Sequence, residues 1–210
     1  MLQIYETSPD ELRKQRGMAT LRTFIGIAIS PVIQQQILAA QKAWGEVVPG
    51  IRWIKPENLH LTLKFLGEIE ETLVDPIHHR MQRVAGGVAP FTLTIQGLGV
   101  FPNLSRPRVL WLGVNQGKQS LQTLYALLQA ELTPLGFPAE KRAYTPHLTL
   151  ARFKTFSSPS LLSALLQQSL RYEFAPLSVH RIDLIRSQLH PGGAIYTCLR
   201  SVELSQPEES

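Results

Sequence analysis

Short stretches of alternating or continuous apolar residues, separated by longer stretches with helical spacing, follow one another along this chain. Alternation over four to eight residues is typical of β-strands, and apolar residues three or four positions apart are typical of amphipathic helices. On this basis strands are expected at 23–29, 51–54, around His60, at 91–100, 108–114, around His147, at 174–186 and 194–204. Helices are expected at 32–44, 70–84, 119–132 and 161–170.

The order strand–helix–strand–helix–strand occurs twice, and one tetrapeptide marks the same place in each copy. The sequence His-Leu-Thr-Leu begins at His60 and again at His147, 87 positions later. So long a period indicates two pseudo-symmetric lobes and not a solenoid. We therefore predict an α+β fold with two mainly antiparallel sheets facing across a central cleft and helices outside. No linker separates the halves, which predicts one bilobal domain over 20–205 after a flexible, polar tail over 1–19.

Each tetrapeptide is expected to present two polar side chains on one face of a strand. Successive side chains of a strand point to opposite faces, so His60 and Thr62 lie together, while the leucines between and after them pack behind. His147 and Thr149 repeat the arrangement. Two such faces brought together would form a cleft that holds two imidazoles and two hydroxyl groups.

That set of groups fits acid–base chemistry at phosphorus. Imidazole has an ordinary pKa of about 6.5, so His60 and His147 can divide the work of proton donor and proton acceptor near neutral pH. Which histidine has which role does not follow from the residues. The hydroxyl groups of Thr62 and Thr149 can donate hydrogen bonds to a developing phosphoryl anion.

Arg152 is a candidate phosphate ligand whose position in the strand poses a difficulty. Its guanidinium could bind phosphate through two charge-assisted hydrogen bonds. On a regular strand, however, position 152 points with Leu148 and Leu150, away from His147. Arg152 reaches the cleft only if the strand bends, bulges or ends after Leu150. The first copy has Phe65 at the equivalent position.

Composition and charge narrow the class of protein. The formal net charge of +5 modestly favours an anionic ligand. No apolar stretch approaches the roughly 20 residues that span a bilayer, and charged residues occupy the place of a secretory signal. The single cysteine, Cys198, cannot form an internal disulfide, which fits a cytoplasmic protein, and it is expected to be buried on a late strand.

Other catalytic sites find little support. Catalytic zinc needs three protein ligands, and neither motif has an acidic residue or cysteine placed to complete a set. The sequence contains no nucleophile elbow, no phosphate-binding P-loop and no dinucleotide fingerprint. His78, His79 and His180 are expected on the surface. His190 adjoins a Pro-Gly-Gly turn, where it either hydrogen-bonds the turn or lies at the mouth of the site.

The flanks of both motifs resemble a known family. The run Arg52–Glu68 (RWIKPENLHLTLKFLGE) is similar to the first signature of the two-histidine (2H) phosphoesterase superfamily, and Pro146–Arg152 (PHLTLAR) is similar to the second. The nearest match is the bacterial and archaeal RNA 2′,3′-cyclic phosphodiesterases, formerly called 2′-5′ RNA ligases. The resemblance covers roughly 21–204.

The resemblance implies metal-independent opening of a terminal RNA 2′,3′-cyclic phosphate to a 2′-phosphomonoester, without a cofactor. It implies that His60 is the general acid and His147 the general base, with Thr62, Thr149 and Arg152 on the phosphate oxygens. A nucleobase is expected to stack near the cleft, with Tyr144 and Phe153 as candidates because both are close to the second motif. The substrates would be RNA ends or nucleotides with a 2′,3′-cyclic phosphate, and we expect a monomer. Two alternatives are 2′-5′ joining of RNA ends and a non-catalytic RNA-end binding module.

Overall fold

The computed structural model describes residues 20–48, 50–154, 158–191 and 193–205. The strands are β1 (Thr20–Ala28), β2 (Ile51–Trp53), β3 (His60–Glu70), β4 (Phe91–Leu93), β5 (Ile95–Phe101), β6 (Val109–Val114), β7 (His147–Phe153), β8 (Leu177–Val179), β9 (Arg181–His190) and β10 (Gly193–Glu203). The helices are α2 (Pro31–Val47), α3 (Val74–Ala85), α4 (Lys118–Leu132) and α5 (Pro159–Ser169). The predicted tail over 1–19 lies outside the described residues.

An eight-stranded antiparallel sheet is made of two halves that meet at its centre. Its order is β10-β9-β1-β3-β7-β6-β5, and β2 pairs with β7. We call β10-β9-β1-β3 the first half-sheet and β7-β6-β5 with β2 the second half-sheet. The halves are joined through one residue pair, Leu61 of β3 opposite Leu148 of β7. Strands β4 and β8 form a separate two-stranded sheet. The predicted α+β class with antiparallel sheets is confirmed.

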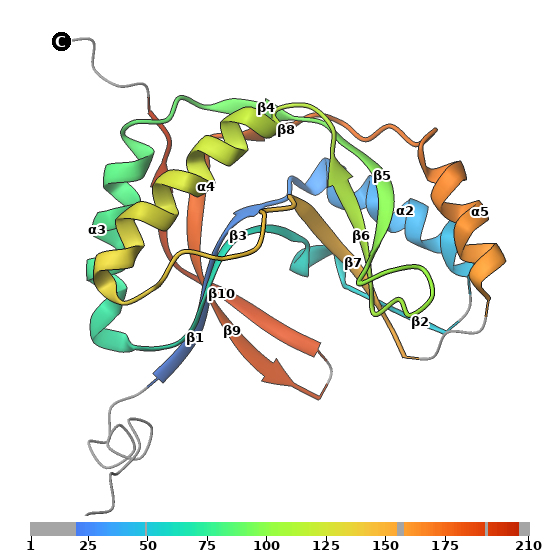
Figure 1. Cartoon of the computed structure of the whole chain (residues 1–210), viewed down its shortest axis with the longest axis horizontal. Coiled ribbons are helices and arrows are strands. Elements are labelled where there is room, and N and C mark those ends of the chain that lie inside the picture. Colours follow the sequence, from blue (N-terminus) through green and yellow to red (C-terminus); the bar gives the residue numbers. More distant parts are fainter. Residues whose placement is uncertain (1–19, 49, 155–157, 192, 206–210) are drawn as a thin grey trace, which may run out of the picture.

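Each half-sheet has its own pair of helices on the outside. Helices α3 and α4 contact one another and strands of the first half-sheet, while α2 contacts α5, which lies against β5 of the second half-sheet. Figure 1 shows these two helix pairs at opposite ends of the molecule. The buried apolar side chains nevertheless form one cluster that extends through both halves. None of the helices in the described part of the chain is long and apolar enough to cross a membrane.

The 87-residue offset seen in the sequence is a structural repeat. It aligns β3 with β7, and Pro31, where α2 begins, with Lys118, where α4 begins. Leu61 and Leu148 are equivalent residues that face each other, so an approximate twofold axis passes between them. Strand β5 follows β4 in the first repeat but joins the second half-sheet. Strand β9 follows β8 in the second repeat but joins the first half-sheet. Each half-sheet is therefore completed by a strand that follows the other repeat's second helix.

This exchange explains where the predicted strands break. The expected strand 91–100 is interrupted at Thr94, and the expected strand 174–186 is interrupted at His180. In each case the first part pairs in the small sheet and the second part joins the large one. The pattern of apolar residues continues across the break because both parts are buried, so periodicity alone does not reveal it.

Two further predictions were wrong in detail. The helix expected to begin at Glu70 begins at Val74, because β3 continues to Glu70, paired with Thr20 of β1, and a short 3-10 turn follows. Cys198 is on a late strand, β10, as predicted, but it is exposed and not buried. Its sulfur lies 3.3 Å from the hydroxyl oxygen of Ser201.

Candidate active site

Strands β3 and β7 bring the four polar side chains of the two His-Leu-Thr-Leu motifs together at the join between the half-sheets. In each motif the histidine and threonine are half-buried on one face, and the leucines are buried on the other. Because Leu61 faces Leu148, the antiparallel register places Thr62 beside His147 and His60 beside Thr149. Directly opposed side chains in such a pair have Cβ atoms about 4.5–5.5 Å apart. One small ligand can therefore touch both pairs.

A cleft of ≈ 680 Å³ opens over these four side chains. Its walls come from β3 and β7, from the segment 52–58 and from the end of the β9–β10 hairpin, which projects from the sheet in Figure 1. Beside the motif residues the lining includes Arg22, Thr23, Phe24, Arg52, Trp53, Lys55, Asn58, Phe65, Arg152, Ser187, Leu189, His190, Ile195 and Tyr196. The cleft predicted from the two motifs is thus present, with a third wall that the sequence did not indicate.

Both imidazoles are held in the same tautomer by the same kind of hydrogen bond. Nδ1 of His60 lies 2.8 Å from the carbonyl oxygen of Asn58, and Nδ1 of His147 lies 2.7 Å from the carbonyl oxygen of Thr145. A carbonyl oxygen can only accept, so each Nδ1 donates its hydrogen and each Nε2 is left to exchange a proton with a ligand. Such a bond fixes which nitrogen is reactive.

The surroundings lower the pKa of both histidines below the ordinary value of 6.5. For each, the main cause is burial, which disfavours the charged imidazolium, while the hydrogen bond to the backbone carbonyl acts in the opposite direction. The charge of His147 further lowers the pKa of His60, so the two rings are close enough to interact. A bound anion would favour the charged form of either ring and raise both pKa values.

Arg152 reaches the cleft because β7 has a bulge. Thr149 pairs with Trp111 and Ala151 pairs with Leu110, which leaves Leu150 as an extra residue between them. Beyond an extra residue the alternation of faces is reversed. Leu150 and Ala151 are consequently both buried, and Arg152 lines the cleft with His147. A bulge is one of the three ways in which the sequence allowed Arg152 to reach the cleft.

The same bulge occurs at the equivalent place in β3. Thr62 pairs with Gly26 and Lys64 pairs with Ile25, so Leu63 is the extra residue. Phe65 is thereby turned into the cleft, where 65% of its surface is exposed. The bulge belongs to the repeat, and it places a phenylalanine in one half where the other half has an arginine.

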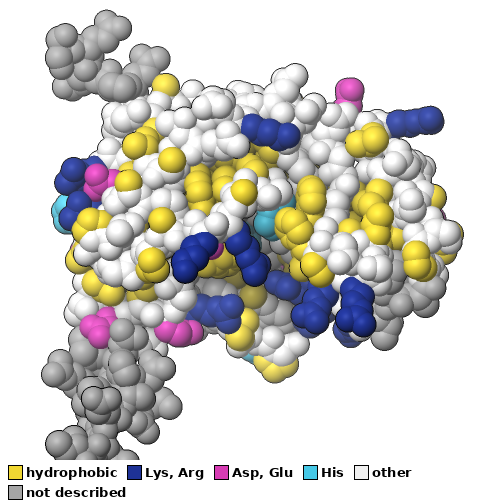
Figure 2. All heavy atoms as spheres, viewed as in Figure 1, with side chains coloured by type: hydrophobic (Ala, Val, Ile, Leu, Met, Phe, Trp, Pro, Cys, Tyr) yellow, Lys and Arg dark blue, Asp and Glu magenta, His cyan; other side chains and the backbone are white. Residues whose placement is uncertain are grey.

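Basic side chains surround the cleft. Arg22, Arg52, Lys55 and Arg152 line it, and none of the described lining residues is acidic. Within the described residues no ion pair joins any of these four to a carboxylate. Figure 2 shows Lys and Arg side chains gathered around the hollow in the middle of the face that is turned to the viewer. The site therefore attracts anions.

Aromatic rings pack against both imidazoles. The ring centres of Phe24 and Tyr196 lie 4.5 and 5.0 Å from that of His60. The ring centres of Phe101 and Trp111 lie 5.0 and 6.1 Å from that of His147. These rings keep water from the imidazoles, which explains why burial dominates the pKa shifts. Sequence reasoning missed them, because they come from strands far from either motif.

The two residues predicted to stack a nucleobase are elsewhere. Tyr144 stacks on Tyr125, with ring centres 4.1 Å apart, and its hydroxyl donates a hydrogen bond of 3.0 Å to the carbonyl oxygen of Thr62. Phe153 is half-buried and packs against the hydrophobic core. Neither lines the cleft, but Tyr144 lines a second hollow beside His147. Phe65 lines the cleft, and the equivalence of positions 65 and 152 was the signal in the sequence that could have identified it.

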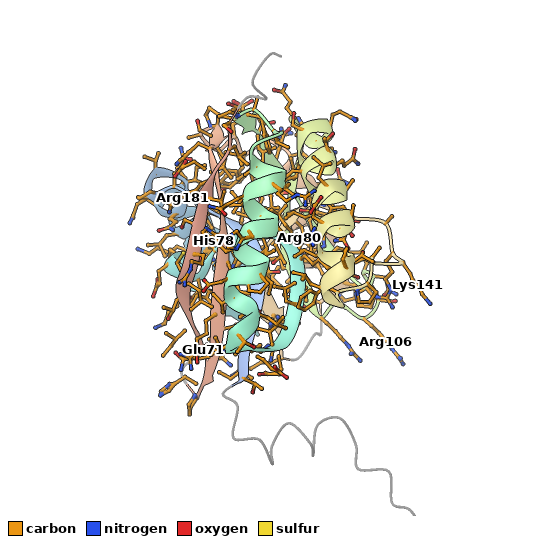
Figure 3. All side chains as sticks on the ribbon, turned by 90° about the vertical axis from the view of Figure 1, so that its left-hand side faces the viewer. Glu71, His78, Arg80, Arg106, Lys141 and Arg181 are labelled. Carbon is orange, nitrogen blue, oxygen red and sulfur yellow. The ribbon has the colours of Figure 1, made fainter. Side chains whose placement is uncertain are left out.

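The other histidines separate into two groups. His79 and His180 are exposed and His78 is half-buried, all outside the cleft, and Figure 3 shows His78 on the outer side of the molecule beside Arg80. His190 lines the mouth of the cleft at the end of β9. Among the residues that the structure describes, no group of three His, Cys, Asp or Glu side chains is placed to hold a metal ion.

Comparison with known proteins agrees with this geometry. Residues 36–191 match the model of the 2′-5′ RNA ligase superfamily. The RNA 2′,3′-cyclic phosphodiesterase of Aquifex aeolicus is 34% identical over 190 residues, which cover 89% of this chain and 99% of that protein. The protein of the same name from Methanothermobacter thermautotrophicus is 33% identical over 177 residues, 84% of this chain and 95% of its own length.

The fold is also that of a solved structure. The crystal structure of LigT from Escherichia coli in complex with 3′-AMP has a TM-score of 0.71 and 26% sequence identity, and covers 90% of this chain and 100% of that one. The sequence match extends over most of the chain and includes both His-x-Thr strands. The chain belongs to the 2′-5′ RNA ligase superfamily.

Proposed function

We propose that this chain is an RNA 2′,3′-cyclic phosphodiesterase that opens a terminal 2′,3′-cyclic phosphate to a 2′-phosphomonoester. The observation that carries the proposal is the pair of imidazoles on equivalent strands, each with a free Nε2, at the centre of a cleft lined by four cations and by no described carboxylate. That arrangement suits an anionic ester whose two sides need a proton donor and a proton acceptor. Relatives at 33–34% identity have the same activity in their names.

In the proposed reaction water attacks phosphorus and the bond from phosphorus to O3′ breaks. Nε2 of His147 takes a proton from the water, and Nε2 of His60 supplies a proton to the departing O3′. The product keeps its phosphate on O2′, and both imidazoles return to their starting states by exchange with solvent. The symmetry of the site does not distinguish the two roles, and their assignment follows the family resemblance.

Thr62, Thr149 and Arg152 would hold the non-bridging oxygens of the phosphate. The register sets each threonine hydroxyl beside the histidine of the other strand, so both lie within reach of one phosphate group. Arg152 adds a charge-assisted contact on the His147 side. Bound phosphate would raise the pKa of His60, and it would thereby supply the protonated acid that the free protein disfavours.

The terminal nucleobase would stack on Phe65. This ring is 65% exposed and lies in the cleft on the His60 side, across from the guanidinium of Arg152. Stacking of a base on an exposed aromatic ring contributes about 1–3 kcal/mol and tolerates any base. Recognition of the RNA end would then depend on the cyclic phosphate and on stacking of the base, and little on which base it is.

We expect the protein to act as a monomer, because the same chain supplies both His-x-Thr strands that the proposed reaction needs. Sedimentation of the active protein would test this: a dimer that alone is active would contradict it. The cytoplasmic location predicted from the single cysteine stays a prediction.

The deciding experiment uses an RNA that ends in a 2′,3′-cyclic phosphate, incubated with the protein in EDTA, and determines the position of the phosphate in the product. A 2′-phosphate that forms in EDTA supports the proposal. A joined product in the presence of an RNA with a 5′-hydroxyl, formed faster than the hydrolysed one, would favour 2′-5′ ligation, in which an alcohol replaces the water. Tight binding with no product would favour the non-catalytic binding module.

A further inference from the structure

A second hollow, of ≈ 470 Å³, adjoins His147 and takes no part in the reaction described above. It lies between β5, β6, the start of α4 and the segment 144–146 that leads into β7. Its lining includes Thr145 and Pro146, which precede His147 in the chain, and Gly113, which pairs with His147. The hollow is therefore separated from the catalytic cleft only by the His147 position.

The hollow and the cleft share one face of the second half-sheet. Gly113 pairs with His147, and Trp111 pairs with Thr149. Residues directly opposite one another in an antiparallel pair present their side chains on the same face. Leu112, between them on β6, is fully buried on the other face. A chain bound at the imidazoles can thus continue over Gly113 into the hollow without crossing the sheet.

The floor of the hollow is shaped to accept a flat group. At Gly113 the neighbouring groups approach the backbone closely: a Cβ there would lie 3.1 Å from the carbonyl oxygen of Gln96 and 3.3 Å from the ring of Trp111. Gly97, also in the lining, has a φ of 77°, which favours glycine. The ring of Trp111 lies across Gly99, where a Cβ would overlap it. Together these residues form an aromatic and backbone surface, and the side chains of Leu170 and Tyr144 border it.

The rim of the hollow is polar and basic. Lys118, the first residue of α4, is exposed, and within the described residues no ion pair joins it to a carboxylate. Three amide side chains complete the rim, and the amide of Asn115 donates to Oε1 of Gln96 over 2.9 Å, which fixes the orientation of both. They are Gln96, Asn115 and Gln122. No described lining residue is acidic.

We infer that this hollow binds the nucleotide next to the terminal one, with its base on Trp111 and the phosphate that joins the two nucleotides near Lys118. A flat aromatic floor, amides at the rim and one unpaired cation are the groups that bind a single nucleotide of a single strand. The inference rests on the proposed function, because it takes the cyclic phosphate to be held between the two imidazoles. It makes the preferred substrate an RNA of two or more nucleotides, and cyclic mononucleotides poorer substrates.

The test compares kcat/KM for 2′,3′-cyclic AMP with kcat/KM for the dinucleotide ApA that ends in a 2′,3′-cyclic phosphate. The expected ratio is tenfold or more in favour of the dinucleotide. A dinucleotide with an abasic first position is expected to lose about fivefold or more, the contribution of one stacked base. Lys118→Ala is expected to reduce kcat/KM several-fold for the dinucleotide only, and to lower the slope of log(kcat/KM) against log[salt] by about 0.7, since one phosphate contact to a single strand is lost.

Lys42→Ala is the matched control, because Lys42 is an exposed lysine of α2 that lines neither hollow. Lys42→Ala should leave kcat/KM unchanged for both substrates. Equal kcat/KM for the mononucleotide and the dinucleotide, or a loss in Lys118→Ala that is the same for both, would overturn the second nucleotide site and leave the proposed function standing. Failure to open either substrate would instead overturn the proposed function.

Discussion

The half of the molecule that contains His60 and the half that contains His147 have the same backbone plan and different side chains at one decisive position. Both have a His-x-Thr strand, a bulge after it and an Nδ1 hydrogen bond to the carbonyl two residues earlier. After the bulge one half presents Phe65 and the other presents Arg152. In the proposed reaction the repeated features would supply paired proton exchange, and this difference makes the two sides of the site unlike, with an apolar ring on one side and a cation on the other.

A second difference lies behind the cleft. Lys64 is buried, whereas the equivalent residue in the other half is Ala151. Nζ of Lys64 donates to Oε1 of Gln129 on α4 and, over 2.8 Å, to the carbonyl oxygen of Pro138. Burial lowers the pKa of this amine. Lys64 thereby connects the segment that leads to His147 with the strand that carries His60. Ala151, at the equivalent position, has no polar group that could make such a connection.

The largest effect is expected from removal of either imidazole. His60→Ala and His147→Ala should each reduce kcat by about 10²–10⁴-fold, the usual contribution of a positioned acid or base. The double variant should lose much less than the product of the two, since the groups act on one transition state. Single-turnover measurement checks this, with the thermal unfolding midpoint and His78→Ala on α3 as controls. Activity that survives either change would mean that the repeat is not a catalytic pair.

The pH dependence tests whether the two imidazoles are shifted in the same direction. Burial lowers both pKa values below 6.5, and the reaction needs one ring protonated and one neutral. The profile of kcat/KM should therefore be bell-shaped with its maximum below pH 6.5, falling up to tenfold per pH unit outside the bell. The maximum of the kcat profile should lie at a higher pH than that of kcat/KM, because bound phosphate raises the pKa values of both imidazoles. A kcat/KM maximum above pH 7 would contradict the burial argument.

Arg152→Ala and Phe65→Ala test whether the two sides of the site bind different parts of the substrate, the phosphate and the terminal base. Loss of a hydrogen bond to a charged group costs about 1.5–3 kcal/mol, so Arg152→Ala should lower kcat/KM about 10- to 150-fold for every substrate with a cyclic phosphate. Phe65→Ala should lower kcat/KM by a factor equivalent to about 1–3 kcal/mol, but only for substrates with a terminal base. An abasic terminal nucleotide distinguishes the two. If Phe65→Ala affects the abasic substrate as strongly, the ring has a structural role.

Tyr144→Phe should have the smallest effect. It removes the hydrogen bond to the carbonyl oxygen of Thr62, about 0.5–1.5 kcal/mol of unfolding free energy, and keeps the stacking on Tyr125. Because the next residue, Thr145, orients the imidazole of His147, kcat should fall several-fold with KM nearly unchanged. Tyr125→Phe keeps the same stack without touching that hydrogen bond, so it is the matched control. Equal losses in both variants would show that the hydrogen bond to Thr62 is not the cause of the effect.

The sequence predicted the parts of this structure that depend on local pattern. The strands around His60 and His147 and the four helices all follow from spacing within a few residues, whereas for Arg152 the sequence left a bend, a bulge and a strand end as alternatives. The breaks at Thr94 and His180 depend on pairing between distant strands, which spacing does not report. Tyr144 is near the second motif in sequence, but it lines the second hollow, beside α4, and not the cleft. Proximity along the chain is a poor guide where the chain enters a strand.

Because β5 and β9 are exchanged, each imidazole of the candidate site packs against a ring from the opposite repeat. Strand β9 pairs with β1, beside the strand of His60, and its partner β10 carries Tyr196, whose ring packs on His60. Strand β5 ends at Phe101, whose ring packs on His147. Neither repeat can form its own half of the site in isolation, so an isolated repeat would need a second copy to lend it that strand. A substitution that disturbs the packing of one repeat should consequently alter the surroundings of the imidazole in the other repeat.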